Sequence, residues 1–167
     1  AAMIDLGGIA KGWIADALDA ALAQPGIPGY VIDLGGNILV RGEKPDGSPW
    51  TVGLPDPACG PGARERMKPV GTIRIAGGSV VTSGVYERAR VCDGVLYHHV
   101  LDPKTGMPIA VEHPAVSVVC ERSIDAEGFS TTLLALGIEK SRELAAEHPE
   151  VLQAYFISWD GSVHPLR

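Results

Sequence analysis

The sequence predicts an α+β fold: a single domain with a mostly antiparallel sheet and packed helices. Short strand-like segments outnumber helical ones, and glycine-rich turns typical of hairpins separate most neighbouring strands. Only three segments have helical periodicity. A doubly wound parallel sheet would instead alternate strands with helices along the whole chain.

Composition excludes several classes of protein. The chain has 167 residues, of which 46% are hydrophobic and 20% charged, as expected for a globular domain with one sizeable core. A net charge of −6 argues against nucleic acid as a partner. No apolar run is long enough to span a membrane. The cysteines are widely spaced and favour neither a disulfide framework nor a zinc site: Cys59, Cys92 and Cys120.

The N-terminal segment predicts a strand end followed by a helix. Ala1–Ile4 resembles the end of a strand, and we therefore expect that the N-terminal portion of a longer protein is missing. A helix is predicted over Ala10–Ala23. Its apolar residues recur every four positions and should form the buried face: Ile14, Leu18 and Leu22. Two carboxylates should point away from that face: Asp16 and Asp19.

The middle of the chain is predicted to be strands and hairpins. Strands are expected at Tyr30–Leu34, Ile38–Arg41, Trp50–Leu54, Thr72–Ala76 and Ser79–Ser83. Residues 43–71 otherwise look like a surface excursion. Residues 90–97 contain Asp93-Gly94, a strong hairpin-turn signal. The sequence Ile-Asp-Leu-Gly-Gly occurs at 4–8 and again at 32–36, so two glycine edges could approach one ligand, or could simply form tight turns.

The last third predicts a strand, two helices and a closing hairpin. The strand is Ala115–Cys120, and the helices are Asp125–Leu136 and Glu139–His148, with Gly137 ending the first. Ala154–Trp159 and Ser162–His164 should pair across Asp160-Gly161.

A polar loop follows the central hairpin. Two histidines, an aspartate, a lysine and a threonine lie within Tyr97–Pro108, where a strand turns into a proline-stiffened loop. Loops carried on a rigid scaffold are common places for chemistry. A solvated surface turn is the alternative interpretation.

Five motifs, taken in order, resemble one family. They are Asp5-Leu6-Gly7-Gly8-Ile9-Ala10-Lys11-Gly12, Asp33-Leu34-Gly35-Gly36-Asn37, Ser83-Gly84-Val85-Tyr86-Glu87-Arg88, His99-Val100-Leu101-Asp102-Pro103-Lys104-Thr105-Gly106 and Ala126-Glu127-Gly128-Phe129-Ser130-Thr131. The chain resembles the ApbE family, the FAD:protein FMN transferases, formerly called thiamine-biosynthesis lipoproteins. The resemblance covers nearly the whole chain, corresponds to the C-terminal part of such a protein, and implies an ApbE-like T-fold domain.

The resemblance implies a magnesium-dependent reaction on FAD. FAD is split at its diphosphate, FMN is joined through a phosphoester to a Ser or Thr of a target flavoprotein, and AMP leaves. Such chemistry needs charge neutralisation and positioning more than a protein nucleophile. No nucleic-acid partner is expected.

Glu127 and Thr131 are the candidate side-chain ligands of the metal. They are four residues apart on a predicted helix and therefore share a face. A carboxylate and a hydroxyl suit Mg²⁺, which prefers oxygen ligands and keeps several waters. The resemblance implies that the backbone carbonyl of Gly8 is the remaining metal ligand that the protein supplies. Without the family, the pair would be a surface Glu and a Thr bonding back to its own helix.

The flavin-binding residues follow from the resemblance alone. Lys11 would lie against the flavin or its phosphates, and the remaining residues would wall the flavin and its ribityl chain: Ser83, Gly84, His99, Asp102 and Thr105. His99 is the candidate catalytic residue, because an imidazole can take the acceptor hydroxyl's proton near neutral pH. A packing or flavin-contacting His99 is the alternative, and Asp102 could instead organise its loop.

Two departures from the family leave other functions open. The family usually has Asp where this chain has Glu127, and the extra methylene displaces the carboxylate by roughly a bond length. The family's N-terminal portion, which helps to cover FAD, is absent from these residues. The alternatives are a non-catalytic flavin-binding module and an FAD pyrophosphatase that gives FMN and AMP.

Overall fold

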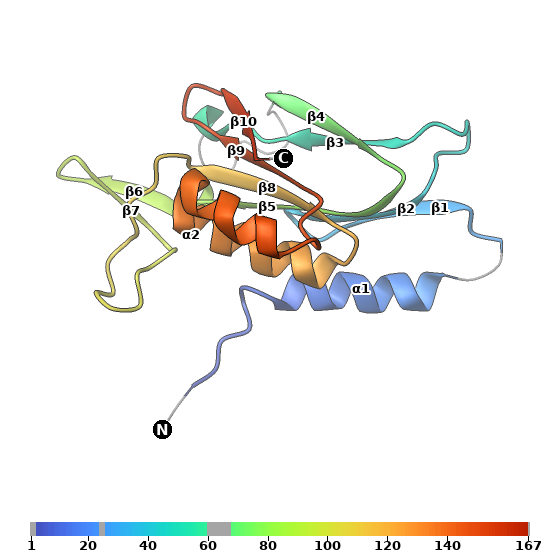
Figure 1. Cartoon of the computed structure of the whole chain (residues 1–167), viewed down its shortest axis with the longest axis horizontal. Helices are drawn as coiled ribbons and strands as arrows, with labels where there is room; N and C mark the ends of the chain where they lie inside the picture. The colour runs from blue at the N-terminus through green and yellow to red at the C-terminus, as the bar shows by residue number, and fades with distance from the viewer. Residues whose placement is uncertain (1–2, 24–25, 60–67, 167) are drawn as a thin grey trace.

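A six-stranded antiparallel sheet forms the centre of the molecule (Figure 1). The computed structural model describes residues 3–23, 26–59 and 68–166. The strand order is β1-β2-β5-β8-β9-β10, and every pairing is antiparallel. The strands are β1 (Gly29–Asp33), β2 (Asn37–Gly42), β5 (Gly77–Gly84), β8 (Ala115–Cys120), β9 (Gln153–Ile157) and β10 (Val163–Pro165). The predicted α+β class is confirmed.

The remaining strands of the described residues form two two-stranded ribbons: β3 (Trp50–Leu54) with β4 (Gly71–Ile75), and β6 (Ala89–Cys92) with β7 (Val95–His98). Short 3₁₀ turns cover Pro57–Cys59 and Tyr86–Arg88. The predicted bounds of β3 and β8 agree with the structure, and the other predicted strands are confirmed with small shifts at their ends. The β6–β7 hairpin projects from one end of the sheet in Figure 1.

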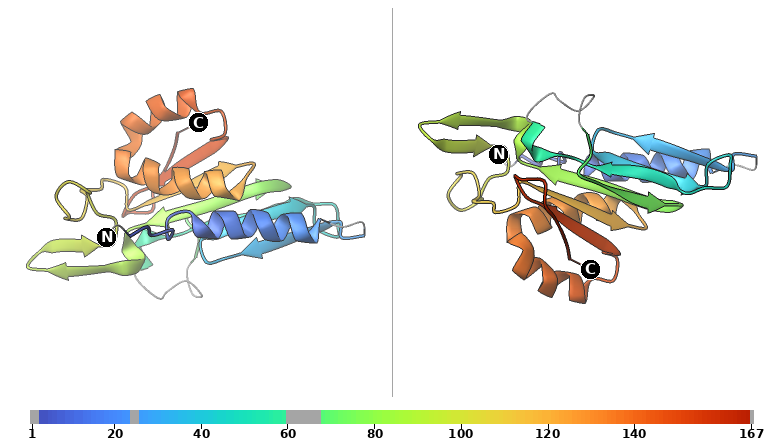
Figure 2. Two further views of the ribbon diagram at one scale, coloured as in Figure 1. Left: turned by 90° about the horizontal axis from the view of Figure 1, so that it is seen from below. Right: turned by 90° about the horizontal axis from the view of Figure 1, so that it is seen from above.

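The sheet is covered on both faces. Helices α1 (Ala10–Leu22) and α2 (Ser123–Glu147) lie side by side on one face, and the β3–β4 ribbon lies on the other (Figure 2). One apolar cluster joins α2 to the sheet through residues such as Leu133, Val118 and Phe156. A second cluster joins the ribbon to the opposite face. All six residues of β8 are buried, as expected for a central strand covered on both sides.

Helix α2 consists of two helical segments separated by a break at Gly137. Gly137, with φ 75° and ψ 170°, interrupts the helical geometry between them. Glycine adopts this positive φ without the steric cost that a Cβ would bring. The predicted pair of helices separated at Gly137 is confirmed.

The predicted orientation of α1 is wrong. Its apolar stripe is about 40% exposed, with 41% for Ile14, 40% for Leu18 and 41% for Leu22. The buried residues of the helix are Gly12 and Ala15, so the face that meets the protein is a small-residue face. Periodicity indicates which face of a helix is apolar, but two helices that approach closely pack through the face that carries small residues.

The two α1 carboxylates expected to point outward instead contact the protein. Asp16 accepts hydrogen bonds from the backbone N–H groups of Ser123, at 2.8 Å, and Ile124, at 3.0 Å. These are otherwise free donors at the start of α2, so Asp16 acts as its N-terminal cap from another helix. Asp19 pairs with Arg41 and accepts from the Tyr30 hydroxyl, and the Arg41 guanidinium lowers the pKa of Asp19.

The predicted strand end at the N-terminus is also wrong. Met3 and Ile4 form no strand and are exposed, while Ala1 and Ala2 lie outside the described residues. Neither helix in the described ranges combines the length and the apolar character that crossing a bilayer requires.

Replacing Gly12 should destabilise the fold. A Cβ added at Gly12 would lie 2.6 Å from Ile124 Cα, 2.6 Å from the Ser123 carbonyl oxygen and 2.8 Å from Glu127 Cβ. Because two of these atoms are backbone, we expect Gly12→Ala to cost about 1–3 kcal/mol in the free energy of unfolding, measured by urea denaturation. In Gly128→Ala the nearest atom is Ile9 Cδ1 at 3.5 Å, so that matched variant should be neutral or stabilising by up to about 1 kcal/mol. Equal effects of the two substitutions would contradict this account.

Candidate active site

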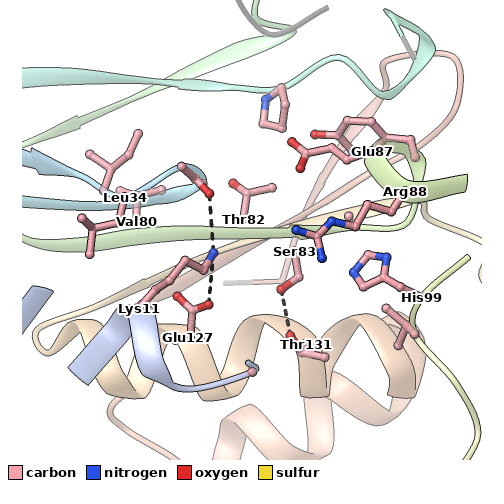
Figure 3. Close-up of a pocket in the computed structure, with 18 of the residues that line it drawn as sticks. Lys11, Leu34, Val80, Thr82, Ser83, Glu87, Arg88, His99, Glu127 and Thr131 are labelled. Carbon is pink, nitrogen blue, oxygen red and sulfur yellow. Dashed lines mark hydrogen bonds and ion pairs between the residues drawn. The ribbon is translucent and has the colours of Figure 1, made fainter. Parts of the chain in front are cut away.

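A cavity of about 970 Å³ opens beside the N-terminal ends of both helices. Its wall includes the turn before α1, the β1–β2 turn, the end of β3, the end of β5 with the Tyr86–Arg88 turn, the start of the His99 loop and the first turns of α2. Its volume lies at the upper end of the range for small-molecule sites, large enough for an extended ligand. Figure 3 shows the side chains that reach it from these separate segments.

The carboxylate of Glu127 stands at the inner wall of this cavity. The residue is only 6% exposed, and both carboxylate oxygens have partners. Lys11 Nζ lies 3.2 Å from Oε1, and the side-chain amide of Asn37 donates to Oε2 at 2.6 Å. Lys11 also reaches the Gly35 carbonyl oxygen at 3.5 Å (Figure 3). The buried charge is therefore paired and hydrogen-bonded, which offsets the cost of removing it from water.

Thr131 lies one helical turn after Glu127 and lines the same cavity. Its Oγ1 is 2.9 Å from Ser83 Oγ, which is also 2.8 Å from Ser130 Oγ (Figure 3). The neighbouring Thr132, rather than Thr131, donates back to its own helix, at the Gly128 carbonyl. Ser83 thus holds the Thr131 hydroxyl, and the expected shared face of Glu127 and Thr131 is present.

The two Ile-Asp-Leu-Gly-Gly segments both contribute to the wall. The Asp5 carboxylate accepts from the Gly7 N–H at 2.7 Å, and Asp33 accepts from the Gly35 N–H at 2.9 Å. The same Asx turn therefore forms twice and brings backbone to one cavity from two places. Gly8 follows the first of these turns and also lines the cavity.

His99 lines the cavity, next to Arg88 in the view of Figure 3. Burial lowers the pKa of His99 below its ordinary value of 6.5, and the positive charge of Arg88 lowers it further. The imidazole is therefore neutral at pH 7. His98 is buried and bonds to the Ile109 carbonyl and the Val100 N–H, which ties β7 to the loop that follows.

Gly84 also lines the cavity, whereas Asp102 and Thr105 are not among its wall residues. The Asp102 carboxylate accepts from the Lys104 N–H at 2.8 Å, and Thr105 Oγ1 accepts from the Met107 N–H at 3.3 Å. Both side chains organise their own loop, and a contact of either with flavin stays a prediction.

The charge of the wall matters for any phosphate ligand. Its cationic side chains are Lys11 and Arg88, and its carboxylates are Asp5, Asp33, Glu87 and Glu127. A diphosphate entering this cavity would meet more negative than positive charge, and a bound divalent cation would offset this excess.

The donors available suit Mg²⁺. Among the described residues no group of three or more His, Cys, Asp or Glu is placed to hold a metal. The cavity wall offers oxygen donors instead, which include the Glu127 carboxylate, the Thr131 hydroxyl and backbone carbonyls such as that of Gly8. Mg²⁺ is typically held by few protein oxygens together with phosphate and water, whereas zinc prefers nitrogen and sulfur.

Three residues important to this geometry had no predicted role. Asn37 and Arg88 both lie inside the recognised motifs, yet nothing in their spacing indicates what they contact. Asp16 was expected to face outward. The hydrogen bond from Asn37 to Glu127 spans 90 residues and that from Ser123 to Asp16 spans 107, so only the tertiary fold reveals them.

Known proteins similar to this chain share one description. The FAD:protein FMN transferase of Treponema pallidum (strain Nichols) is 40% identical over 168 residues, which cover 96% of this chain and 45% of the relative. That of Klebsiella pneumoniae (strain 342) is 39% identical over 93% of this chain and 45% of its own length. The chain therefore spans less than half the length of these curated relatives.

Solved structures agree with the sequence relatives. The ApbE protein of Thermotoga maritima has a TM-score of 0.79 at 30% identity, over 96% of this chain and 50% of that protein. The Pseudomonas stutzeri flavinyl transferase ApbE has a TM-score of 0.74 at 32% identity, over 98% of this chain and 48% of that protein. The family model for ApbE matches residues 1–156. This chain is a member of the ApbE family.

Proposed function

We propose that this chain carries the catalytic site for transfer of FMN from FAD to a Ser or Thr hydroxyl of a target flavoprotein, with Mg²⁺ required and AMP released. One observation supports this most strongly. Gly8 and Lys11 at the start of α1, and Glu127 and Thr131 on α2, are more than 100 residues apart in the sequence and line one cavity large enough for a dinucleotide. The relatives named FAD:protein FMN transferase support the same reaction.

The chain's own residues would bind the diphosphate of FAD by charge and position. Glu127 Oε1, Thr131 Oγ1 and the Gly8 carbonyl are the groups that would hold Mg²⁺. When bound, this ion would supply positive charge to the phosphate oxygens and to the leaving AMP. Lys11 would complement that charge, because its ammonium already lies in the cavity beside Glu127.

The acceptor hydroxyl would attack the phosphorus of the FMN half. A new P–O bond forms, the bond from this phosphorus to the bridging oxygen breaks, and AMP leaves with that oxygen. The hydroxyl proton needs an acceptor, and neutral His99 has a lone pair available because burial and Arg88 lower its pKa. Water in place of the acceptor hydroxyl would give FMN and AMP at the same site.

Glu127→Gln should abolish most of the Mg²⁺-dependent reaction. The substitution keeps the shape of the side chain and removes its charge, so we expect a loss on the order of 100-fold in AMP release, by analogy with removing one charge-stabilising group. The measurement combines the chain, FAD, Mg²⁺ and a target flavoprotein, with AMP and protein-bound flavin fluorescence followed together.

The matched control is Glu143→Gln, an exposed glutamate farther along α2, which should leave the rate unchanged. A folded parent chain that neither releases AMP nor binds FAD more tightly with Mg²⁺ would contradict the proposal and favour a non-catalytic flavin-binding module. AMP release without any target protein would favour FAD hydrolysis.

The pH dependence should report His99. Because its pKa is lowered, His99 stays neutral down to a pH below 6.5, and activity should fall only as the pH drops through that lowered pKa. Arg88→Ala removes a positive charge that disfavours the imidazolium, so the pKa of His99 and the acidic limb of the pH profile should both move upward. Arg88→Lys keeps the charge and should move them less. Imidazole NMR titration gives the pKa directly, and an unchanged His99 pKa in Arg88→Ala would refute the electrostatic argument.

A further inference from the structure

A row of buried, hydrogen-bonded polar side chains lies behind Glu127, on the side away from the cavity. Asn37, the only asparagine in the sequence, is fully buried at the start of β2, and Ser79 and Ser123 are fully buried beside it. Ser123 Oγ donates to Asn37 Oδ1 at 2.8 Å, and Asn37 Nδ2 donates to Glu127 Oε2 at 2.6 Å. Ser79 Oγ lies 3.0 Å from Ser123 Oγ and 3.0 Å from the Ile38 carbonyl oxygen.

The donors and acceptors along this row of hydrogen bonds are determined by the Glu127 carboxylate at its end. An ionised carboxylate only accepts hydrogen bonds, so the Asn37 group that faces Glu127 must be the NH₂. Asn37 Oδ1 then faces Ser123, whose hydroxyl must donate to it. The directions of the Asn37 amide and the Ser123 hydroxyl are therefore fixed, and the amide cannot flip without leaving two buried groups unpaired.

The consequence concerns which oxygen of Glu127 faces the cavity. Oε2 is occupied by Asn37 within the protein, whereas Oε1 lies 3.2 Å from Lys11 Nζ on the cavity side. A free glutamate side chain samples many rotamers, and ordering it costs up to about 2 kcal/mol. Here the hydrogen bond from Asn37 already orders the Glu127 side chain.

We infer that Asn37, oriented by Ser123, is a positioning residue that fixes Glu127 so that Oε1 alone is presented to a cation in the cavity. The inference rests on the proposed function, because it assigns a role within the same metal site. Partners that orient metal-binding side chains commonly change metal affinity by about 10- to 100-fold when they are removed.

The test measures Mn²⁺ binding by electron paramagnetic resonance, with Mn²⁺ as a probe for Mg²⁺ and FAD present. We expect Asn37→Ala and Ser123→Ala each to weaken Mn²⁺ binding by about 10-fold or more, approaching the effect of Glu127→Gln. Ser141→Ala is the matched control: Ser141 is also a fully buried serine of α2, but its hydroxyl donates to the Leu133 carbonyl away from the cavity. It should lower stability without changing Mn²⁺ affinity.

The outcomes separate the two ideas. If Glu127→Gln loses Mn²⁺ binding while Asn37→Ala and Ser123→Ala fold and keep the parent affinity within twofold, the positioning role is refuted and the metal site stands. If one of these two variants fails to fold, the other still decides. If the parent chain binds no Mn²⁺, or Glu127→Gln binds as well as the parent, the proposed metal site fails and this inference fails with it.

Discussion

The contact between α1 and α2 is the constraint on which the site depends. Gly12 lets the two helices approach so closely that a Cβ would meet the backbone of Ser123 and Ile124. At the same place Asp16 accepts the first free N–H groups of α2. The start of α2 is therefore held by a neighbouring helix, and every candidate metal ligand on α2 follows within three turns of that point.

The electrostatics of the cavity follow from this arrangement. A carboxylate as buried as Glu127 is costly unless it is paired, and its partners come from α1 and from the start of β2. Lys11 is more than a third exposed, so water screens its pairing with Glu127 and the pair adds little to stability. Its main effect is to place a cation and an anion at one wall of a cavity that is otherwise rich in carboxylates.

Much of the architecture was predictable because local signals were strong. Turn residues and alternation indicated nearly every strand, and Gly137 indicated the break in α2. The spacing of Glu127 and Thr131 correctly placed both on one helical face. The orientation of α1 was mispredicted, because its stripe of Ile14, Leu18 and Leu22 indicates an apolar face without identifying what packs against the helix. The roles of Asn37 and Asp16 depend on partners 90 or more residues away, and no local pattern encodes such contacts.

The separation of these partners has a thermodynamic consequence. Since Glu127 meets Lys11 and Asn37 only when the helices and the sheet have assembled, an unfolded chain contains no site at all. Any ligand of this cavity therefore binds the native state alone, and saturating it at about 100 times its dissociation constant raises the free energy of unfolding by roughly 2.7 kcal/mol. Occupancy and folding are thus linked equilibria, and the melting temperature rises with the fraction of molecules whose cavity is occupied.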